Sequence, residues 1–427
     1  MDEKLLQYIW KHKLFVMSNL QTVSGENVSI MSVGFTNPDS GPDYINVRLK
    51  LNDTLWVGCV EIHLNSSDWD KHKHQQDEAY SNVILHVVYE HDKDIYTTAG
   101  KCLPTLELKP LINQKVIDIY RLYMNSSSDI PCQNQFDTVD AFRLFSWLDR
   151  LLIERLEERT QEIKRLLEKK VHNKEEVFYY YLAQAFGFKT NALPFSLLAE
   201  SLPLIYLSKQ KNNLFQLEAM LFGQADLLPT DDTDEYTDAL RKEYTFLQKK
   251  FSLTPLCRAS MWKFAKLYPS GFPTIRIAQF AALIHQSSAL LSKALETDNI
   301  EGLTKLFTAK ASDYWKSHYR FGKSSLKVTD KGLGEFAVHS LLINTALPFM
   351  YAYSQWEGNQ VLQNKVISLY EQLPFETNGT VRKFIPLRSD FSNALHSQSL
   401  MQLYNKYCSS KQCLHCGIGI SLISNVT

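Results

Sequence analysis

The sequence of 427 residues predicts an α+β protein, with a strand-rich N-terminal part followed by a long helical part. Three observations support this fold class. Residues 44–51 alternate between apolar and polar side chains, as a strand with one buried face does. Residues 83–89 form a nearly unbroken apolar run, which is typical of a strand buried on both faces. From residue 144 onward, apolar side chains recur at helical spacing.

The N-terminal part reads, in chain order, as helix, strand, hairpin, helix and buried strand. An apolar stripe predicts a helix over residues 2–20, and Ser66, Ser67 and Asp68 begin a second helix that runs to about Tyr80. The predicted strands cover residues 28–35, 44–51, 55–64, 83–89 and 104–108. The turn Asn52-Asp53-Thr54 joins the second and third of these strands into a hairpin.

The second part of the chain is predicted to be entirely helical. A long helix with a charged face runs to Lys170 and is followed by further amphipathic segments. These segments cover residues 178–186, 195–207, 214–222, 238–251, 274–291 and 337–356. The polar stretch Asn125–Asp137 marks the boundary, so we expect a sheet domain over residues 1–125 and a helical domain over 138–427, ending in a cysteine-containing tail.

The composition predicts a cytoplasmic protein without a membrane segment. Hydrophobic residues make up 44% and charged residues 22%, and no run of about 18 apolar residues occurs. The charged N-terminus lacks a signal-peptide pattern, and the seven cysteines do not form a disulfide framework. Lys plus Arg equals Asp plus Glu at 46 each, so no net positive field favours nucleic acid. The sequence leaves the oligomeric state open.

Two carboxylates are placed to meet across the predicted hairpin. Asp43 follows Pro42 at the start of one strand, and Glu61 lies late on its partner. Side chains two apart on a strand share a face, so Glu61 and His63 project together. Paired carboxylates bind Mg²⁺ or Mn²⁺ and allow the metal to activate water. We therefore predict a magnesium or manganese site held by Asp43 and Glu61, with His63 beside it.

These motifs, in this order of elements, resemble the PD-(D/E)XK nucleases over roughly residues 1–110. In that superfamily an Asp and an acidic-x-Lys element hold the metal and the attacking water, and here Glu61-Ile62-His63 carries His in place of Lys. Gln76-x-x-x-Tyr80 resembles the helix motif of the RecB-like branch. The resemblance implies a restriction-endonuclease-like sheet and a metal-dependent nuclease acting on nucleic acid, with Asp43, Glu61 and His63 as catalytic residues.

The same resemblance implies residues that position the substrate. Gln76 and Tyr80 are expected to do so from their helix, and His72 and His74 are the neighbouring candidates. An alternative is a non-catalytic nucleic-acid-binding or scaffold protein on a degenerate nuclease fold. The loss of Lys favours it, as does the acidic balance of residues 1–115, which hold 11 basic and 15 acidic residues.

A third possibility is a zinc hydrolase, because histidines are dense in this part of the chain. Five of the twelve histidines lie between residues 63 and 91. His72 and His74 are two apart and cannot share one face of a helix. If the segment is turned instead, His63 and one of these two histidines would bind Zn²⁺ or another transition metal.

A second group of metal-ligand residues lies near the C-terminus. Cys408, Cys413 and Cys416 precede Gly417-Ile418-Gly419, a spacing that suits a zinc or iron–sulfur loop. Cys257, His415 or Cys132 would supply the fourth ligand. The alternative is a reduced tail with redox-sensitive thiols. With its N-terminal block, helical region and cysteine tail, nearly the full chain resembles a bacterial family known as a domain of unknown function.

Overall fold

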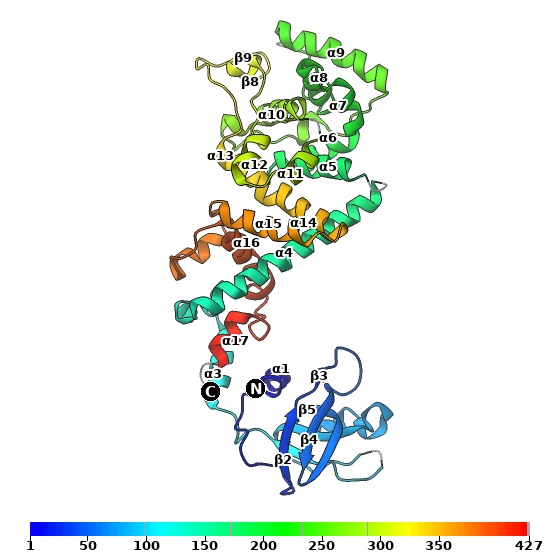
Figure 1. Ribbon diagram of the computed structural model, residues 1–427, viewed down its shortest axis with the longest axis vertical. Helices are drawn as coiled ribbons and strands as arrows, with labels where there is room; N and C mark the ends of the chain where they lie inside the picture. The colour runs from blue at the N-terminus through cyan, green and yellow to red at the C-terminus, as the bar shows by residue number, and fades with distance from the viewer. Residues whose placement is uncertain (98, 171–172, 232–233, 288, 425–427) are drawn as a thin grey trace. The chain divides into compact units, whose positions relative to one another are not determined.

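The computed structural model describes residues 1–97, 99–170, 173–231, 234–287 and 289–424. An N-terminal mixed sheet is followed by a helical region (Figure 1), as the sequence predicts at this level. The chain divides into two compact units. The first unit consists of Met1–Trp147, Lys383–Ser389 and Leu403–Thr427, and the second of Leu148–Arg382 and Asp390–Gln402.

The first unit is built on one seven-stranded sheet. Its strands are β1 (Leu20–Gln21), β2 (Asn27–Ser32), β3 (Phe35–Thr36), β4 (Tyr44–Leu51), β5 (Thr54–Asn65), β6 (Val83–Glu90) and β7 (Thr105–Glu107). The order is β1-β2-β4-β5-β6-β7, and β3 pairs with β4 outside this path. β2, β4 and β5 are antiparallel neighbours, whereas β6 is parallel to both β5 and β7. The pairing direction therefore changes at β5.

The strand predictions are confirmed for the hairpin and the buried strand. β4 buries Val47, Leu49 and Leu51 and exposes the residues between them, as its alternation predicts. The first six residues of β6 are all buried. The hairpin turn consists of Asn52 and Asp53, and Asn52 adopts a left-handed φ of 50° that asparagine tolerates well.

The first helix is shorter than predicted. α1 (Glu3–His12) begins after Asp2, whose side chain accepts a hydrogen bond of 2.8 Å from the Leu5 amide. It ends at Lys13, which has a left-handed φ of 53°, and the chain enters β1 at Leu20. The expected helix over residues 2–20 is therefore wrong at its C-terminal end. α1 packs against β5.

The helix expected from Ser66 to Tyr80 is replaced by three short turns. These are α2 (Asp68–Lys71), η1 (His74–Gln76) and η2 (Glu78–Tyr80). Lys73 has a left-handed φ of 64°, and Asp77 is extended and accepts a hydrogen bond from the Ala79 amide. The prediction of one continuous helix is wrong because buried Trp69 packs against His74 and Tyr80, which requires the chain to turn back.

Helical segments complete the first unit. They are α3 (Gln114–Asn125), η3 (Gln133–Thr138), the first turns of α4 (Ala141–Lys169), η9 (Ile385–Leu387), the π-helical η10 (Leu403–Cys408) and α17 (Gly417–Ser424). α17 packs against α3. The polar stretch before α4 contributes buried side chains of its own, because Ile130, Cys132 and Phe136 are all at most 8% exposed.

In its described residues, the second unit is helical apart from the hairpin of β8 (His318–Arg320) and β9 (Lys323–Ser324). After α4 its helices are α5 (Lys174–Phe186), α6 (Ala192–Ser201), α7 (Leu204–Gln210), α8 (Leu214–Gln224), α9 (Glu235–Phe251), α10 (Pro273–Gln286), α11 (Leu290–Glu296), α12 (Ile300–Phe307), α13 (Glu335–Leu341), α14 (Leu347–Trp356), α15 (Gln360–Gln372) and α16 (Ala394–Gln402). Short turns lie between them: η4 (Ala259–Met261), η5 (Pro269–Gly271), η6 (Asp313–Lys316), the π-helical η7 (Leu342–Ala346) and η8 (Val381–Lys383).

Two predicted helices of the second unit are each divided. The segment expected over 195–207 is interrupted at Pro203, which cannot donate the helical hydrogen bond and begins α7. The segment expected over 274–291 is interrupted before Ala289, whose φ of 57° is left-handed. Within the described ranges, no helix combines the length and apolar character that crossing a bilayer requires.

Candidate metal centre

Two neighbouring strands and the first helix bring the predicted site residues together. Asp43 immediately precedes β4, and Glu61 and His63 lie near the end of β5. His86 of β6 pairs directly opposite Glu61 in the parallel ladder. Gln7 of α1 donates a hydrogen bond of 2.8 Å to Asp43 Oδ1. The site is therefore assembled on rigid elements, at the strand where the sheet changes from antiparallel to parallel pairing.

Three histidines converge at this point. His63 Nε2 lies 3.1 Å from His72 Nδ1, and His63, His72 and His74 each offer a ring nitrogen within 4.8 Å of the other two. Glu61 Oε1 lies 3.4 Å from His63 Nε2 and 3.4 Å from His74 Nε2. Glu61 Oε1 therefore lies beside two of the three converging imidazoles.

Three of these separations are close to those between neighbouring ligands of one metal ion. Zinc holds nitrogen and oxygen ligands at about 2.0–2.2 Å, which places neighbouring ligand atoms about 3.3–3.5 Å apart. The separations of 3.1, 3.4 and 3.4 Å agree with that geometry to within a few tenths of an ångström. The donor set of three imidazoles and one carboxylate suits zinc and its transition-metal neighbours better than Mg²⁺, which prefers oxygen ligands.

The break in the predicted helix is what lets both His72 and His74 take part. His72 is the C-cap residue that follows α2, and His74 opens η1. The left-handed Lys73 between them reverses the chain, so their side chains point the same way. From the sequence, one of these histidines was expected to join His63 only if the segment is turned. In the structure, ring nitrogens of both lie close to a nitrogen of His63.

Asp43 and Glu61 lie side by side, as the sequence predicts, but they are linked through the backbone. The Asp43 amide donates to Glu61 Oε2 at 3.0 Å, and the Ile62 amide donates to Asp43 Oδ2 at 3.0 Å. Burial raises the pKa of Asp43 to about 6. Burial, followed by repulsion from Asp43, raises the pKa of Glu61 to about 8. The pocket thus disfavours two bare negative charges and would gain from a cation.

The imidazoles are held in the neutral form that binds metals. His63 is 1% exposed, and burial, followed by repulsion from His74 and His72, lowers its pKa to about 3. Burial lowers the pKa of His74 to about 4. Its Nε2 atom is buried and has no hydrogen-bond partner among the described residues. A neutral imidazole with an unused lone pair is what a metal ion requires of its ligand.

His63 is oriented from behind by a further histidine. His63 Nδ1 lies 2.9 Å from His86 Nε2, and His86 is completely buried. If His63 Nε2 offers its lone pair to a metal, Nδ1 carries the proton and donates it to His86 Nε2. Metal-bound histidines usually donate their second N–H in this way, which fixes the ring and its tautomer.

Aromatic packing fixes the remaining histidine. The His74 and Tyr80 rings stack with centroids 3.8 Å apart, and Trp69 packs edge-on against both. Gln76 is exposed on η1, on a different turn from Tyr80. Tyr80 therefore supports a candidate ligand, and the two residues do not form the single-helix motif that the sequence predicts. Their expected role in positioning substrate stays a prediction.

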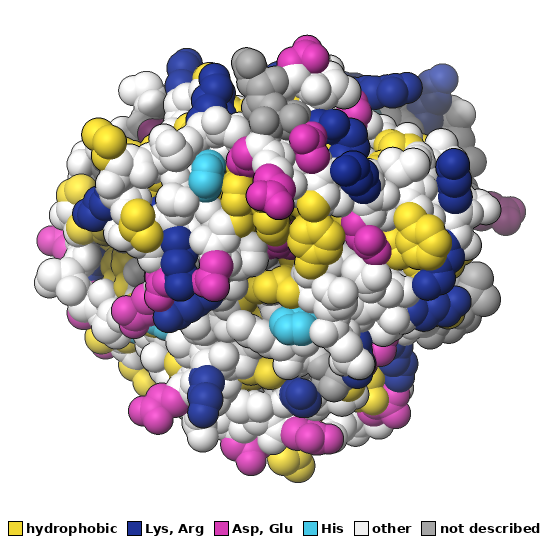
Figure 2. Space-filling model, turned by 90° about the horizontal axis from the view of Figure 1, so that it is seen from above, with side chains coloured by type: hydrophobic (Ala, Val, Ile, Leu, Met, Phe, Trp, Pro, Cys, Tyr) yellow, Lys and Arg dark blue, Asp and Glu magenta, His cyan; other side chains and the backbone are white. Residues whose placement is uncertain are grey.

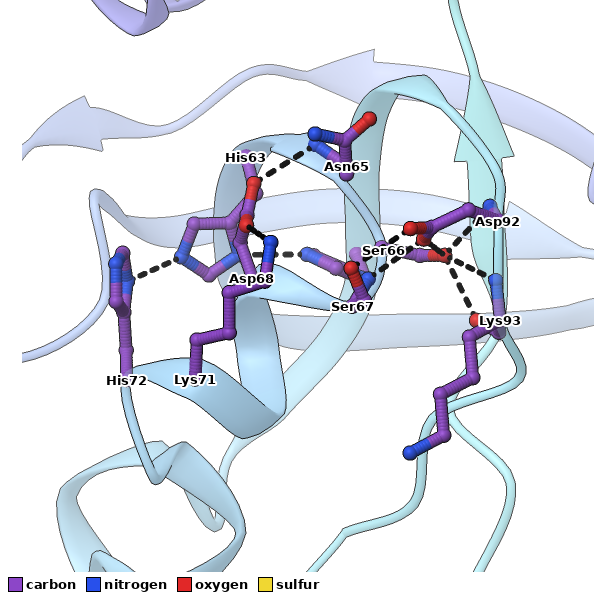
Figure 3. A network of polar contacts seen from close by, with 10 residues as sticks. His63, Asn65, Ser66, Ser67, Asp68, Lys71, His72, Asp92 and Lys93 are labelled. Carbon is purple, nitrogen blue, oxygen red and sulfur yellow. Dashed lines mark hydrogen bonds and ion pairs between the residues drawn. The ribbon is translucent and has the colours of Figure 1, made fainter.

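A polar network anchors the start of α2, just before His72 (Figure 3). Ser66 Oγ donates to Asp92 Oδ1 at 2.9 Å, and the Ser67 amide donates to the same oxygen at 2.8 Å. The Asn65 amide donates to Asp68 Oδ2 at 3.0 Å. In Figure 3 the His72 ring points toward His63 across this turn. The network thereby fixes the helical turn that carries the exposed ligand.

The sequence did not reveal three residues of this site. Glu3 and Gln7 lie one turn apart on α1. Burial is the main cause of the raised pKa of Asp43, the hydrogen bond from the Ile62 amide opposes it, and repulsion from Glu3 adds to it. The spacing of four between Glu3 and Gln7 was the available signal, but nothing in the sequence indicated which strand α1 covers. His86 was expected to be a core histidine, and the structure adds its contact with His63.

The three C-terminal cysteines predicted as metal ligands all belong to the first unit. Cys408, Cys413 and Cys416 are buried free thiols. Of the proposed fourth ligands, Cys132 is buried in the same unit, whereas Cys257 belongs to the second unit. His415 is exposed.

Comparison with known proteins gives one assignment. A search of curated proteins and a search of solved structures each returned no match. A family model described as "Protein of unknown function (DUF2851)" matches residues 3–379. The match spans the sheet, the histidine cluster and most of the helical region, so the expected membership of a family known as a domain of unknown function is confirmed. The chain belongs to the DUF2851 family.

Proposed function

We propose that this protein is a metal-dependent phosphodiesterase that acts on nucleic acid. The metal is a transition-metal ion held by Glu61, His63, His72 and His74, with Asp43 beside it. The observation that carries this proposal is the convergence of three imidazole nitrogens within 4.8 Å of one another, with Glu61 Oε1 at 3.4 Å from two of them.

The chemistry follows from what such an ion does. Bound at this point, it would polarise a phosphoryl oxygen and lower the pKa of a bound water. The protein supplies the ligands from β5, the end of α2 and η1, and Gln7 and the Ile62 amide hold the Asp43 carboxylate in one orientation. Asp43 accepts one hydrogen bond on each oxygen, and each oxygen keeps a further lone pair. Asp43 can therefore orient a nucleophilic water without leaving its position.

The order of elements supports a phosphodiester substrate. α1, β2, β4, β5 and β6 follow one another in the order of the PD-(D/E)XK core, whereas three short turns take the place of its helix between β5 and β6. β5 pairs antiparallel with β4 and parallel with β6, and Glu61 and His63 lie on β5 where that resemblance expects its acidic-x-Lys element. At the position of the Lys, His63 would then act as a metal ligand.

Because the protein has no net charge, a bound metal ion would be the main group that attracts a phosphate. Figure 2 shows Lys and Arg side chains interspersed with Asp and Glu over the face seen from above, and the whole chain is neutral. Mixed charges produce no broad positive field. Binding of a polyanion would therefore depend on the cation, and the expected clamping role of the helical unit stays a prediction.

A second candidate is a non-catalytic scaffold or nucleic-acid-binding protein stabilised by its metal. The observation that favours it is the number of protein ligands. Structural zinc sites are closed by four protein ligands, whereas catalytic sites usually keep one position open for water or substrate. Here three imidazoles converge and Glu61 lies beside two of them, so protein side chains alone could supply four ligands.

A cleavage assay separates the two candidates. The full chain, loaded with Zn²⁺ or Mn²⁺, is mixed with single- and double-stranded DNA and with RNA. Asp43→Asn removes a carboxylate that is not among the four proposed ligands, and Asp39→Asn, in the exposed loop before it, is the matched control. The phosphodiesterase proposal predicts cleavage by the wild type and by Asp39→Asn, and a loss of about 100-fold or more in Asp43→Asn, which still binds metal.

Two outcomes would decide against it. Cleavage that survives in Asp43→Asn would remove this residue from the mechanism. If none of the nucleic acids is cleaved although metal is bound and raises the melting temperature, the scaffold is the correct description.

A further inference from the structure

Four buried cysteines from two distant parts of the sequence belong to the first unit. Cys132 precedes η3, Cys408 ends η10, and Cys413 and Cys416 lie in the loop that leads into α17. They are 8%, 8%, 7% and 6% exposed, and all four are free thiols.

The four thiols interact electrostatically with one another. Burial, followed by repulsion from Cys416, Cys132 and Cys413, raises the pKa of the Cys408 thiol. Burial, followed by repulsion from Cys416 and Cys413, raises the pKa of the Cys132 thiol. Burial, then Cys416, raises the pKa of Cys413 to about 12. All six pairs are therefore close enough to interact, which is the arrangement of a single cluster.

The loop around Cys413 and Cys416 directs backbone N–H groups at a sulfur, although burial raises the pKa of the Cys416 thiol to about 11. The Cys416 amide donates to the Cys413 carbonyl at 3.4 Å, which closes a tight turn. Backbone N–H groups of Gly419 and Ile418 donate to the Cys416 sulfur. A Cβ atom at position 419 would lie 2.3 Å from the Cys413 carbonyl oxygen, so only glycine fits there. Amide donors aimed at a sulfur stabilise the thiolate form, which is the metal-binding form.

Other contacts fix the two segments against each other. Lys411 Nζ donates to the Met124 carbonyl at 2.6 Å, and the Tyr123 hydroxyl donates to Gln135 Oε1. Lys411 itself has a left-handed φ of 52°, which helps turn the loop back toward α3. The position of Cys132 relative to the C-terminal cysteines is thus set by hydrogen bonds on both sides.

The spacing of the sulfurs indicates the kind of metal centre. Four thiolates on one zinc ion lie about 3.8 Å apart, given a zinc–sulfur distance of about 2.3 Å. Among the described residues, the histidine trio is the one group of three or more such ligand atoms within 4.8 Å of one another. Three or more of the described cysteine sulfurs do not form such a group, as the ligands of one zinc ion would, whereas a cluster places several irons and sulfides between its thiolates.

We propose that Cys132, Cys408, Cys413 and Cys416 bind an iron–sulfur cluster. This site is separate from the histidine cluster and does not depend on the proposed function. Cys132 completes the set of four thiolates that such clusters use, although it lies far from the other three in the sequence.

Iron, zinc and acid-labile sulfide analysis of the full chain, purified without oxygen, tests the proposal. The wild type is expected to contain iron and sulfide in similar amounts and to show a visible charge-transfer absorption. Cys132→Ser should reduce both contents about tenfold or more, as expected for loss of a ligand. Cys257→Ser is the matched control, because Cys257 is a buried free thiol of the second unit and should leave the contents unchanged.

His63→Ala distinguishes the two sites, since it should remove the histidine-bound metal and keep iron and sulfide. If Cys132→Ser does not fold, Mössbauer spectra of the ⁵⁷Fe-labelled wild type report directly whether the iron is sulfur-bound. Absence of iron and sulfide from the wild type would overturn the proposal. Zinc in place of iron, or equal loss in Cys257→Ser, would overturn it as well.

Discussion

His63 Nδ1 lies 2.9 Å from His86 Nε2, while the opposite nitrogen of the same ring faces His72 at 3.1 Å. The His63 ring therefore links buried His86 of β6 to exposed His72. His86 is fully buried, and its own Nδ1 has no hydrogen-bond partner among the described residues. A buried ring nitrogen without a partner lowers the stability of the fold. This cost is explained if His86 holds the proton on His63 Nδ1.

Replacing His86 by Phe should weaken metal binding without removing a ligand. The variant keeps a ring of similar volume in the core but cannot accept the proton of His63 Nδ1, so we expect an affinity about 10–100-fold lower. Competition with a chromophoric chelator measures this change. His91→Phe is the control, because His91 pairs with Asp94 and is not one of the three converging histidines. Equal affinities for His86→Phe and the wild type would exclude the orienting role.

The left-handed turn at Lys73 gives a second prediction. Lys73→Val should lower the free energy of unfolding by about 1–2 kcal/mol, because a left-handed backbone crowds a β-branched side chain. It should also weaken metal binding, since the turn aims His72 and His74. Lys73→Gly should keep the affinity. Lys13→Val is matched, because Lys13 is an exposed left-handed lysine outside the cluster, with φ of 53°.

Chemical denaturation and metal competition on the same three variants check this prediction. Lys13→Val should lose stability and keep its metal affinity. A Lys73→Val protein that binds metal as tightly as the wild type would show that the turn is not needed to aim the ligands.

The sequence predicted the sheet well because its evidence was local. Alternation in β4 and the apolar run of β6 directly reflect burial on one face or two. It failed from Ser66 to Tyr80, because the packing of Trp69 against His74 and Tyr80 is a tertiary contact that local propensity does not contain. The divided helices in the second unit show a mixed case, since Pro203 was a visible signal and Ala289 was not.

The candidate site was predicted in part for the same reason. Glu61 and His63 share a face by strand periodicity, and the structure places them together with Asp43. His72 and His74 can join them because Lys73 adopts a left-handed conformation. The sequence gives no reason to expect that conformation at a lysine, since it is mainly glycine that adopts it. The sequence therefore favoured oxygen ligands, whereas the structure gathers nitrogen ligands around one of those carboxylates.

A third prediction concerns the network behind α2. Asp92 accepts hydrogen bonds from Ser66, from the Ser67 amide and from the Ser67 hydroxyl, and these bonds lower its pKa to about 2 although burial alone would raise it. Asp92→Ala would deprive the fully buried Ser66 of one partner, so we expect about 1 kcal/mol of lost stability and weaker metal binding.

Urea denaturation and chelator competition measure both effects. Asp94→Ala, at a largely exposed carboxylate whose contact is with His91, should change neither quantity appreciably. A change of the same size in both variants would mean that the network does not specifically support the site.

The second unit yields a pH prediction through Glu218. This side chain is fully buried, accepts hydrogen bonds on Oε2 from Tyr236 and Ser312, and has no hydrogen-bond partner for Oε1 among the described residues. Burial raises its pKa to about 7 from the ordinary value of 4.5, although the hydrogen bonds oppose the change. The folded protein therefore binds this proton more tightly than the unfolded chain does.

The stabilising contribution is present below about pH 4.5 and is lost as the pH rises through about 7, for a total of about 3 kcal/mol. Glu218→Gln should remove this dependence, so its stability relative to the wild type should rise between pH 5 and pH 8. Urea unfolding of both proteins, with chelator present throughout, measures the difference. A difference that does not change with pH would show that Glu218 is ionised in the folded protein at neutral pH.

Zinc titration of the wild type, His63→Ala and His74→Ala tests the histidine cluster most directly. Because the three proteins share every cysteine, any metal bound by thiols cancels in the comparison. We predict that each variant binds one equivalent less than the wild type, whereas His91→Ala binds the same amount. Identical stoichiometry and affinity in all four proteins would contradict the assignment of these side chains as metal ligands.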